Sequence, residues 1–207
     1  MNGLLLERDM PIWLAARPWL NVRSNDVHTL ISYRLARALL RVHADAEEPI
    51  VLMAILLHDT GWKMFPEEML AQAVGPKPKY PELQRAHEIE SARIARAELE
   101  RLAIPSVDID RVIAIIDGHD TRLRALSLDD ALMKDADKLW RFTAHGIATL
   151  CVWFGTPAKE TVAMLESFVL PKFTCETGRT MAQALLADAV AAAWMEDTLK
   201  LTTAPDA

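Results

Sequence analysis

Eight consecutive apolar residues, 50–57, end directly at the polar pair His58–Asp59. The run begins after Pro49, a residue favoured at the first turn of a helix, and it is apolar at every helical spacing. A helix of this kind is buried on all sides, so other elements must surround it. An ionised Asp59 at its end costs several kcal/mol of stability unless it is paired or bound to a metal. The sequence therefore predicts a buried helix that ends in a polar site.

The composition favours helices in the rest of the chain as well. Alanine and leucine are its two commonest residue types, whereas only 7 of the 207 residues are glycine. A sandwich or barrel needs many glycine-marked turns, and a chain of this length can bury roughly 70% of its unfolded surface in one core. We therefore expect an all-α fold that forms a single domain.

Caps, prolines and glycines divide the chain into seven expected helices. The segment 1–24 is expected to cross the domain as an N-terminal strap. Residues 25–145 are expected to form the core, and 146–207 to supply C-terminal packing helices of the same domain. The loop 75–81 is a candidate lid. The expected helices span about 26–42, 49–61, 82–102, 107–117, 127–149, 159–169 and 177–201.

The charge balance and the apolar runs limit the partners. With 29 acidic and 23 basic residues the net charge is −6, and the chain has no basic stretch suited to an extended nucleic acid. The run at 50–57 is too short to span a bilayer, and the first residues lack the pattern of a signal peptide. Cys151 and Cys175 provide neither a disulfide framework nor a zinc motif. We expect a cytoplasmic protein without a membrane partner, and its alanine-rich last helix is a candidate homodimer face.

Four histidines and two aspartates fall where the side chains of a helical bundle point inward or where a helix ends. His28 shares a helix face with Leu35, and His87 shares one with Leu83. Neutral imidazoles together with carboxylates suit Mn, Fe, Co, Ni or Zn better than Ca. The set consists of His28, His58, Asp59, His87, His119 and Asp137.

The order H…HD…H…H…D of these residues resembles the HD superfamily of metal-dependent phosphohydrolases. The strings AILLHDTG, HEIESARIA and MKDADKLW are also similar, and the resemblance covers about residues 25–145. It implies an HD-type helical bundle with one or two divalent metal ions between the core helices. The resemblance implies that His28, His58, Asp59 and Asp137 hold the first metal. A second metal would be held by His87 and His119, with Asp59 bridging the two ions.

The resemblance also implies an activity. It points to a phosphomonoesterase, phosphodiesterase or nucleotide hydrolase that acts on a small phosphorylated substrate by metal-activated water. In such an enzyme Asp59 would be catalytic, because it would bridge the metals that activate the water. Transition-state charge needs basic groups, and we expect Arg122, Lys138 and Lys63 to bind the substrate. Several branches of the superfamily carry a basic residue just after the HDxG string, where this chain has Trp62 followed by Lys63. Asp120, after His119, is interpreted as a local hydrogen-bonding residue.

Two other functions remain open from the sequence. Inositol oxygenase and the phosphonate-cleaving oxygenases share this ligand set, so a binuclear iron oxygenase acting on a small polyol or phosphonate is the main alternative. Ligand residues alone do not separate oxygenase from hydrolase, because redox chemistry depends on the metal that is loaded. A non-catalytic metal-binding sensor is less favoured, since every ligand position is present.

Overall fold

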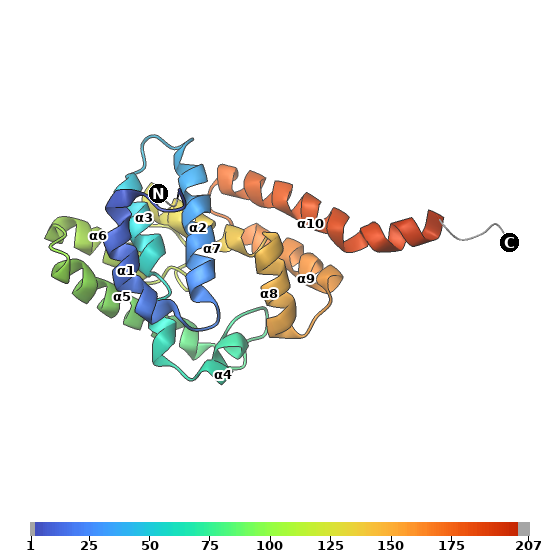
Figure 1. Ribbon diagram of the computed structural model, residues 1–207, viewed down its shortest axis with the longest axis horizontal. Helices are drawn as coiled ribbons and strands as arrows, with labels where there is room; N and C mark the ends of the chain where they lie inside the picture. The colour runs from blue at the N-terminus through green and yellow to red at the C-terminus, as the bar shows by residue number, and fades with distance from the viewer. Residues whose placement is uncertain (1–2, 203–207) are drawn as a thin grey trace.

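The computed structural model describes residues 3–202, without the side chains of 196, 197 and 200–202, and this range contains helices but no strand. The expected all-α fold is confirmed (Figure 1). None of the helices described is long and apolar enough to cross a membrane. The α-helices are α1 (Met10–Leu20), α2 (Asn25–Leu40), α3 (Glu48–Leu57), α4 (Glu67–Leu70), α5 (Glu82–Arg101), α6 (Ser106–Ile116), α7 (Leu128–Trp140), α8 (Ala144–Phe154), α9 (Ala158–Met164) and α10 (Glu176–Thr202). Short 3-10 turns form η1 (Glu7–Asp9), η2 (Thr60–Met64), η3 (Ala71–Ala73) and η5 (Leu170–Lys172), and a π-helical turn forms η4 (Leu165–Val169).

Helix α3 forms the centre of the bundle. Every residue of the apolar run 50–57 is buried, as expected for a helix without a polar face. Helices α1, α2, α5, α6 and α7 all pack against it. Burial of each large side chain contributes about 1.5–3 kcal/mol, so this helix is firmly fixed. Its C-terminal end therefore delivers His58 and Asp59 to a defined point inside the molecule.

Helices α2 and α7 pack closely on each other and flank the end of α3. The buried face of α2 begins with small polar residues, Asn25, Thr29 and Ser32, beside His28. Leu35, expected on the same face as His28, is only half-buried, whereas Leu39 one turn further along is fully buried. His28 points inward as expected, although its neighbours on that face are small and polar.

Helix α7 begins as expected and ends early. The side chain of Ser127 accepts a hydrogen bond from the backbone N–H of Asp130 at 3.2 Å, which caps the first turn. The helix stops at Trp140, and α8 starts at Ala144, so the single helix expected over 127–149 is wrong. At the junction a Cβ on Gly146 would lie 2.1 Å from the carbonyl oxygen of Trp140, so only glycine fits there.

The two ends of the chain cover the core from different sides. The segment expected as a strap contains helix α1, which packs on α3, α5 and η2. The hydroxyl of Tyr33 donates to Asp9 at 2.6 Å and ties this segment to α2. At the other end α10 packs on α7 and α9, and its far part extends away from the bundle (Figure 1). The buried carboxylate of Asp135 accepts from the backbone N–H groups of Thr174 and Cys175, which anchors the start of α10 to α7.

Candidate metal centre and adjoining pocket

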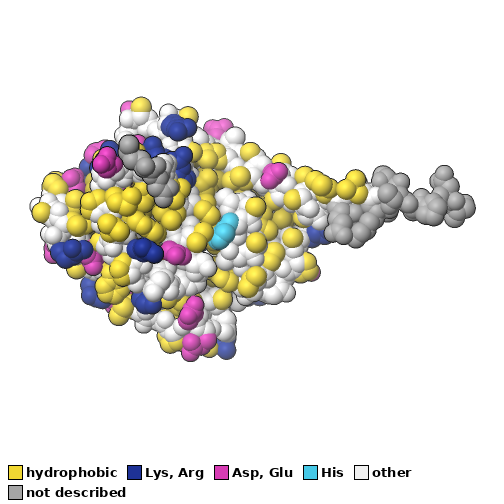
Figure 2. All heavy atoms as spheres, viewed as in Figure 1, with side chains coloured by type: hydrophobic (Ala, Val, Ile, Leu, Met, Phe, Trp, Pro, Cys, Tyr) yellow, Lys and Arg dark blue, Asp and Glu magenta, His cyan; other side chains and the backbone are white. Residues whose placement is uncertain are grey.

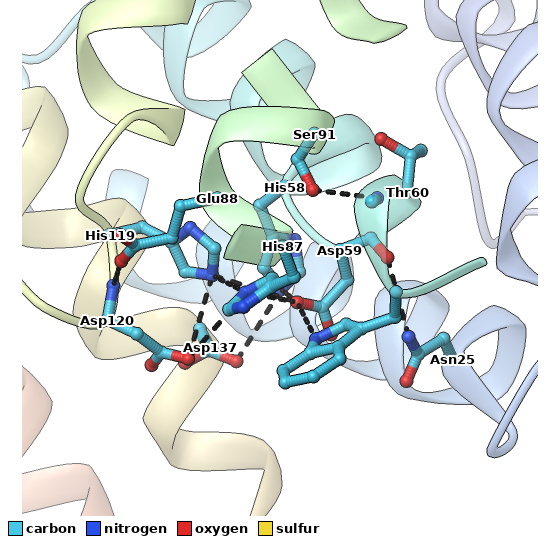
Figure 3. A network of polar contacts seen from close by, with 12 residues as sticks. Asn25, His58, Asp59, Thr60, His87, Glu88, Ser91, His119, Asp120 and Asp137 are labelled. Carbon is cyan, nitrogen blue, oxygen red and sulfur yellow. Dashed lines mark hydrogen bonds and ion pairs between the residues drawn. The ribbon is translucent and has the colours of Figure 1, made fainter. Parts of the chain in front are cut away.

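The six residues expected to bind metal converge from separate elements. They lie on α2, at the end of α3, at the start of η2, on α5, after α6 and on α7, and none is more than 7% exposed. Figure 3 shows five of them in one network of polar contacts. The structure therefore brings together His28, His58, Asp59, His87, His119 and Asp137.

The ring nitrogens of the four histidines approach in two pairs. The Nε2 atoms of His28 and His58 are 3.1 Å apart, and those of His87 and His119 are 3.3 Å apart. An oxygen of Asp137 lies 3.2 Å from the Nε2 of His28. The two pairs are joined by the carboxylate of Asp59.

Asp59 places its two carboxylate oxygens near all four histidines. Its Oδ2 lies 3.4 Å from the Nε2 of His28. Its Oδ1 lies 3.5, 3.6 and 3.7 Å from the Nε2 atoms of His58, His87 and His119. The carboxylate of Asp59 therefore lies close to both histidine pairs.

Backbone carbonyls fix the orientation of three of the four imidazoles. The Nδ1 atoms of His58, His87 and His119 donate to the carbonyl oxygens of Ile55, Leu83 and Ile116 at 2.8, 3.3 and 2.9 Å. A ring that donates through Nδ1 presents a lone pair at Nε2 when it is neutral. The lone pairs of His87 and His119 therefore face each other and require a proton or a cation between them.

The donor set fits divalent metal ions. Three overlapping triplets among the described residues have all their ligand atoms within 4.8 Å of one another. Buried imidazole nitrogens and carboxylate oxygens suit Mn, Fe, Co, Ni or Zn. The third triplet includes Asp120, whose Oδ2 lies 3.9 Å from the Nε2 atoms of both His87 and His119. The triplets are His28–His58–Asp137, His58–Asp59–His119 and His87–His119–Asp120.

Both central carboxylates are held in the charged form. Burial alone would raise the pKa of Asp59, but His58 and the other surrounding histidines together bring it well below its usual value. Burial likewise opposes the charge of Asp137, whose pKa is brought well below its usual value by Arg141 and His28. Nη1 of Arg141 donates to Asp137 Oδ2 at 3.0 Å. The cluster therefore carries the negative charge that a bound cation needs.

The comparison with protein families agrees with this geometry. The HD domain model matches residues 25–141, which is more than half of the chain. The chain belongs to the HD domain family. The resemblance seen in the sequence is therefore confirmed. HD domains bind divalent metals, and the described residues include His/Asp clusters that could hold them.

A structural comparison supports the fold of this HD domain. The crystal structure of a protein from Lactobacillus plantarum superposes with a TM-score of 0.61 at 17% identity and covers 98% of this chain and 100% of its own. At that identity the likeness shows the fold alone. No curated protein sequence matches the chain.

A buried glutamate holds the loop that carries His119 in this HD domain. Glu88 on α5 accepts from the backbone N–H groups of Asp120 and Thr121 at 2.8 and 2.7 Å, and from the Thr121 hydroxyl at 2.7 Å. Arg85 donates to the same carboxylate at 2.9 Å. Glu88 was not among the residues expected at the site, because a glutamate in the polar string HEIES gives no sign of burial.

Glycine at the HDTG string lets η2 approach α5. A Cβ at Gly61 would lie 2.1 Å from the carbonyl oxygen of His87. The N–H of Gly61 donates to Ser91 Oγ at 2.8 Å. The next residue, Trp62, stacks on His87 with ring centroids 3.9 Å apart and donates from Nε1 to Asp59 Oδ1 at 3.1 Å. Trp62 therefore contacts and supports two of the candidate ligands.

A pocket of about 340 Å³ opens beside the HD cluster. His28, Asp59 and Asp120 are among the residues that line it, and many of the others are apolar. On the face of the molecule in Figure 2, by contrast, basic side chains are dispersed among acidic and apolar ones. The cations that line the pocket are Arg23, Lys138, Arg141 and Lys172.

The pocket contains one of the three cations expected to bind substrate. Lys138 lines it, whereas Lys63 is exposed elsewhere. Arg122 is also outside the lining, because its guanidinium donates to the buried Asp130 at 2.9 Å. Arg23 and Lys172 were missed. Arg23 is only five residues before His28, but it precedes the helix that carries this ligand, and both cations reach the pocket through tertiary packing.

Proposed function

We propose that this HD domain is a hydrolase of small phosphate esters or nucleotides that uses metal-activated water. The HD family is one of metal-dependent phosphohydrolases, which supports the reaction class. The observation that carries the proposal is the position of Asp59, whose carboxylate faces both histidine pairs and also lines the pocket. A substrate in the pocket would therefore lie against the residues that hold the metals.

Each ligand has a role in this proposal. His28, His58 and Asp137 would hold one ion, His87 and His119 the other, and Asp59 would bridge them. Divalent ions bound there would supply Lewis acidity toward a phosphoryl oxygen and a water of lowered pKa. Asp120 is a further candidate ligand on the side of the second ion, because its carboxylate is close to both histidines of that pair.

The pocket cations would stabilise the charge that builds up on the phosphoryl oxygens. Arg141 is already bound to Asp137, so its first task is to orient that carboxylate. Lys138 donates from Nζ to the carbonyl oxygen of Lys134 at 3.0 Å and keeps its other two protons for a ligand.

Arg23 is the cation best placed to bind the phosphoryl group. Its guanidinium carbon lies 4.6 Å from the ring centre of Trp62 and 4.2 Å from that of Trp153, so two indoles hold it in place. Burial lowers the pKa of Arg23 to about 10 against the opposing effect of Asp59, which still leaves it charged at neutral pH. Arg23 and Ser24 also have left-handed backbone angles, with φ of 43° and 58°, a strained turn of the kind that occurs at ligand sites.

The experiment combines metal analysis with an activity screen. The protein is purified without chelator or affinity nickel, its metal content is measured, and it is assayed against phosphomonoesters, phosphodiesters and nucleotides. We expect one or two divalent ions per chain and hydrolysis of at least one substrate class. Asp59→Asn should lower kcat/KM by at least about 100-fold, because it removes the charge shared by both ions.

Matched variants and controls make the result decisive. Arg23→Lys keeps the charge but loses the planar stacking and should raise KM or lower kcat, whereas Lys63→Ala, outside the pocket, should leave both unchanged. A fully metallated protein that hydrolyses no phosphate ester or nucleotide contradicts the proposal. Two irons per chain together with oxygen uptake would replace it with the oxygenase alternative.

A further inference from the structure

Two chemically different sets of side chains line the pocket. The charged set consists of His28, Asp59, Asp120 and the four cations. The other set, the apolar wall, comes from the end of α7, from α8 and from the segment from α9 to η4, with Gly75, Pro76 and Pro78 from the loop between η3 and α5. Trp140 of this wall packs edge-on against His28, with ring centroids 4.7 Å apart, so the two sets adjoin. The principal side chains of the apolar wall are Trp140, Leu150, Trp153, Phe154, Phe168 and Val169.

Two of the cations contact aromatic rings of the apolar wall. Arg23 is stacked on Trp153, and the Nζ of Lys172 lies 3.4 Å from the ring centre of Phe168. Each of these aromatic rings therefore contacts a cation and is also part of the apolar wall. A ligand that fits this arrangement is anionic at one end and apolar directly beside it.

The apolar wall provides few partners for a polar ligand. Asn25 and Gln84 are the amide side chains among the described residues that line the pocket, and the amide nitrogen of Asn25 already donates to the Asp59 carbonyl. The buried Nε1–H of Trp140 adds one donor without a partner among the described residues. A nucleobase or a sugar brings several donors and acceptors, and each one buried without a partner costs about 1–3 kcal/mol. An aryl or alkyl group of the same size brings none.

We infer that the substrate is a phosphate ester of an apolar, aromatic-sized alcohol, with the phosphoryl group at the metal centre and the organic group against Trp153, Phe154 and Phe168. The inference rests on the proposed function and narrows its substrate class. The volume of about 340 Å³ is near the lower end for ligand pockets and suits a substrate of this size.

The test compares two phosphonates that differ only in their organic group. Benzylphosphonate and methylphosphonate contain no ester bond, so titration calorimetry with the metal-loaded protein measures binding without turnover. We expect benzylphosphonate to bind at least about ten-fold more tightly, because the wall buries its ring. Equal affinities for the two compounds would overturn the inference.

Wall variants test where the apolar group binds. Phe154→Ala and Phe168→Ala should each bring the ratio of the two Kd values below about three, since each removes part of the wall. Val152→Ala on α8 serves as the control, because its side chain is 81% exposed and outside the pocket lining. The ratio compares two ligands on one variant, so a general loss of phosphonate affinity cancels. An unchanged ratio in both wall variants would overturn the inference.

A nucleotide analogue separates this inference from the proposed function. If the 5′-phosphonate analogue of AMP binds more tightly than benzylphosphonate, the inference is overturned and the hydrolase stands. If the protein prefers benzylphosphonate but hydrolyses neither phenyl phosphate nor AMP, the pocket assignment is supported and the proposed function fails.

Discussion

The imidazoles of His87 and His119 cannot both be neutral at the distance found here. Both rings donate through Nδ1 to a backbone carbonyl, so their facing Nε2 atoms would oppose two lone pairs. In the metal-free site the pair shares a proton that resides mainly on His119. Burial lowers the pKa of His119, but Asp59 and Asp120 outweigh it and raise the value to about 9. Burial and the charge of His119 lower the pKa of His87 to about 4.

Metal binding at this pair should depend on pH. Because the pKa of His119 lies above its usual value, the proton is bound at neutral pH and must leave when a cation binds. We expect the affinity to rise by up to about ten-fold per unit between about pH 7 and 9 and to level off above that. Competition with a chromophoric chelator at several pH values measures it. An affinity that stays flat over this range would show that the pair holds no proton.

Glu88 should act as a positioning residue for the second metal. Glu88→Gln keeps the size but removes the charge and one acceptor for the loop that carries His119 and Asp120. We expect the affinity for one metal to fall by about 10–100-fold while the other site stays occupied. Stepwise metal titration measures this, with Glu90→Gln on the same helix as the control. Equal weakening of both sites would point to a general loss of structure instead.

At the scale of elements, the site depends on the end of one helix packing closely against the side of another. Helix α3 places His58 at its terminus, and η2 then turns directly against α5. That turn has no room for a side chain at Gly61, where a Cβ would overlap the His87 carbonyl. The packing of η2 on α5 thus sets the distance between Asp59 and His87.

Gly61→Ala should disturb both stability and the metal centre. Overpacking of this kind costs about 1–3 kcal/mol, since α5 or η2 must move to accept the methyl group. Urea denaturation measures the loss, and Gly3→Ala is the control because a Cβ there meets nothing within 4 Å. A variant as stable as the wild type would mean that α5 can shift without cost.

Some features of the fold and the site could be predicted from the sequence, and others could not. The ligand set and the buried helix are readable because they depend on local spacing and on the apolar run at 50–57. The break after Trp140 is not, because it depends on the close contact of Gly146 with the preceding helix. Arg122 stood near a ligand in the sequence, yet its position is decided by the buried Asp130. Arg23 was not predicted to bind the substrate, because its proposed role depends on indoles from two distant segments.

At the scale of the whole molecule, the site ties together most of the core. Helices α2, α3, α5 and α7, together with η2 and the loop after α6, each supply a candidate ligand. An unfolded chain does not hold these residues near one another. A bound metal therefore stabilises the folded state selectively.

Removing the metal should lower the stability of the entire chain. At a free metal concentration 100 times the Kd, binding adds about 2.7 kcal/mol to the free energy of unfolding. We expect EDTA to lower the Tm in a single cooperative transition, and readdition of the native metal, but not Ca²⁺, to restore it. Calorimetry with and without chelator checks this. A Tm that ignores chelator and metal alike would contradict the metal centre.

The spread of the ligands from His28 to Asp137 also determines when the site can form during folding. Long stretches of chain must close before His28 meets Asp137, and such distant contacts form slowly. Metal binding should therefore follow the rate-limiting step. Stopped-flow experiments would then find a refolding rate that is insensitive to metal and an unfolding rate that falls as metal is added. The ion would stabilise the fold only after it has formed. Loss of the ion would shorten the lifetime of the native state without slowing its formation.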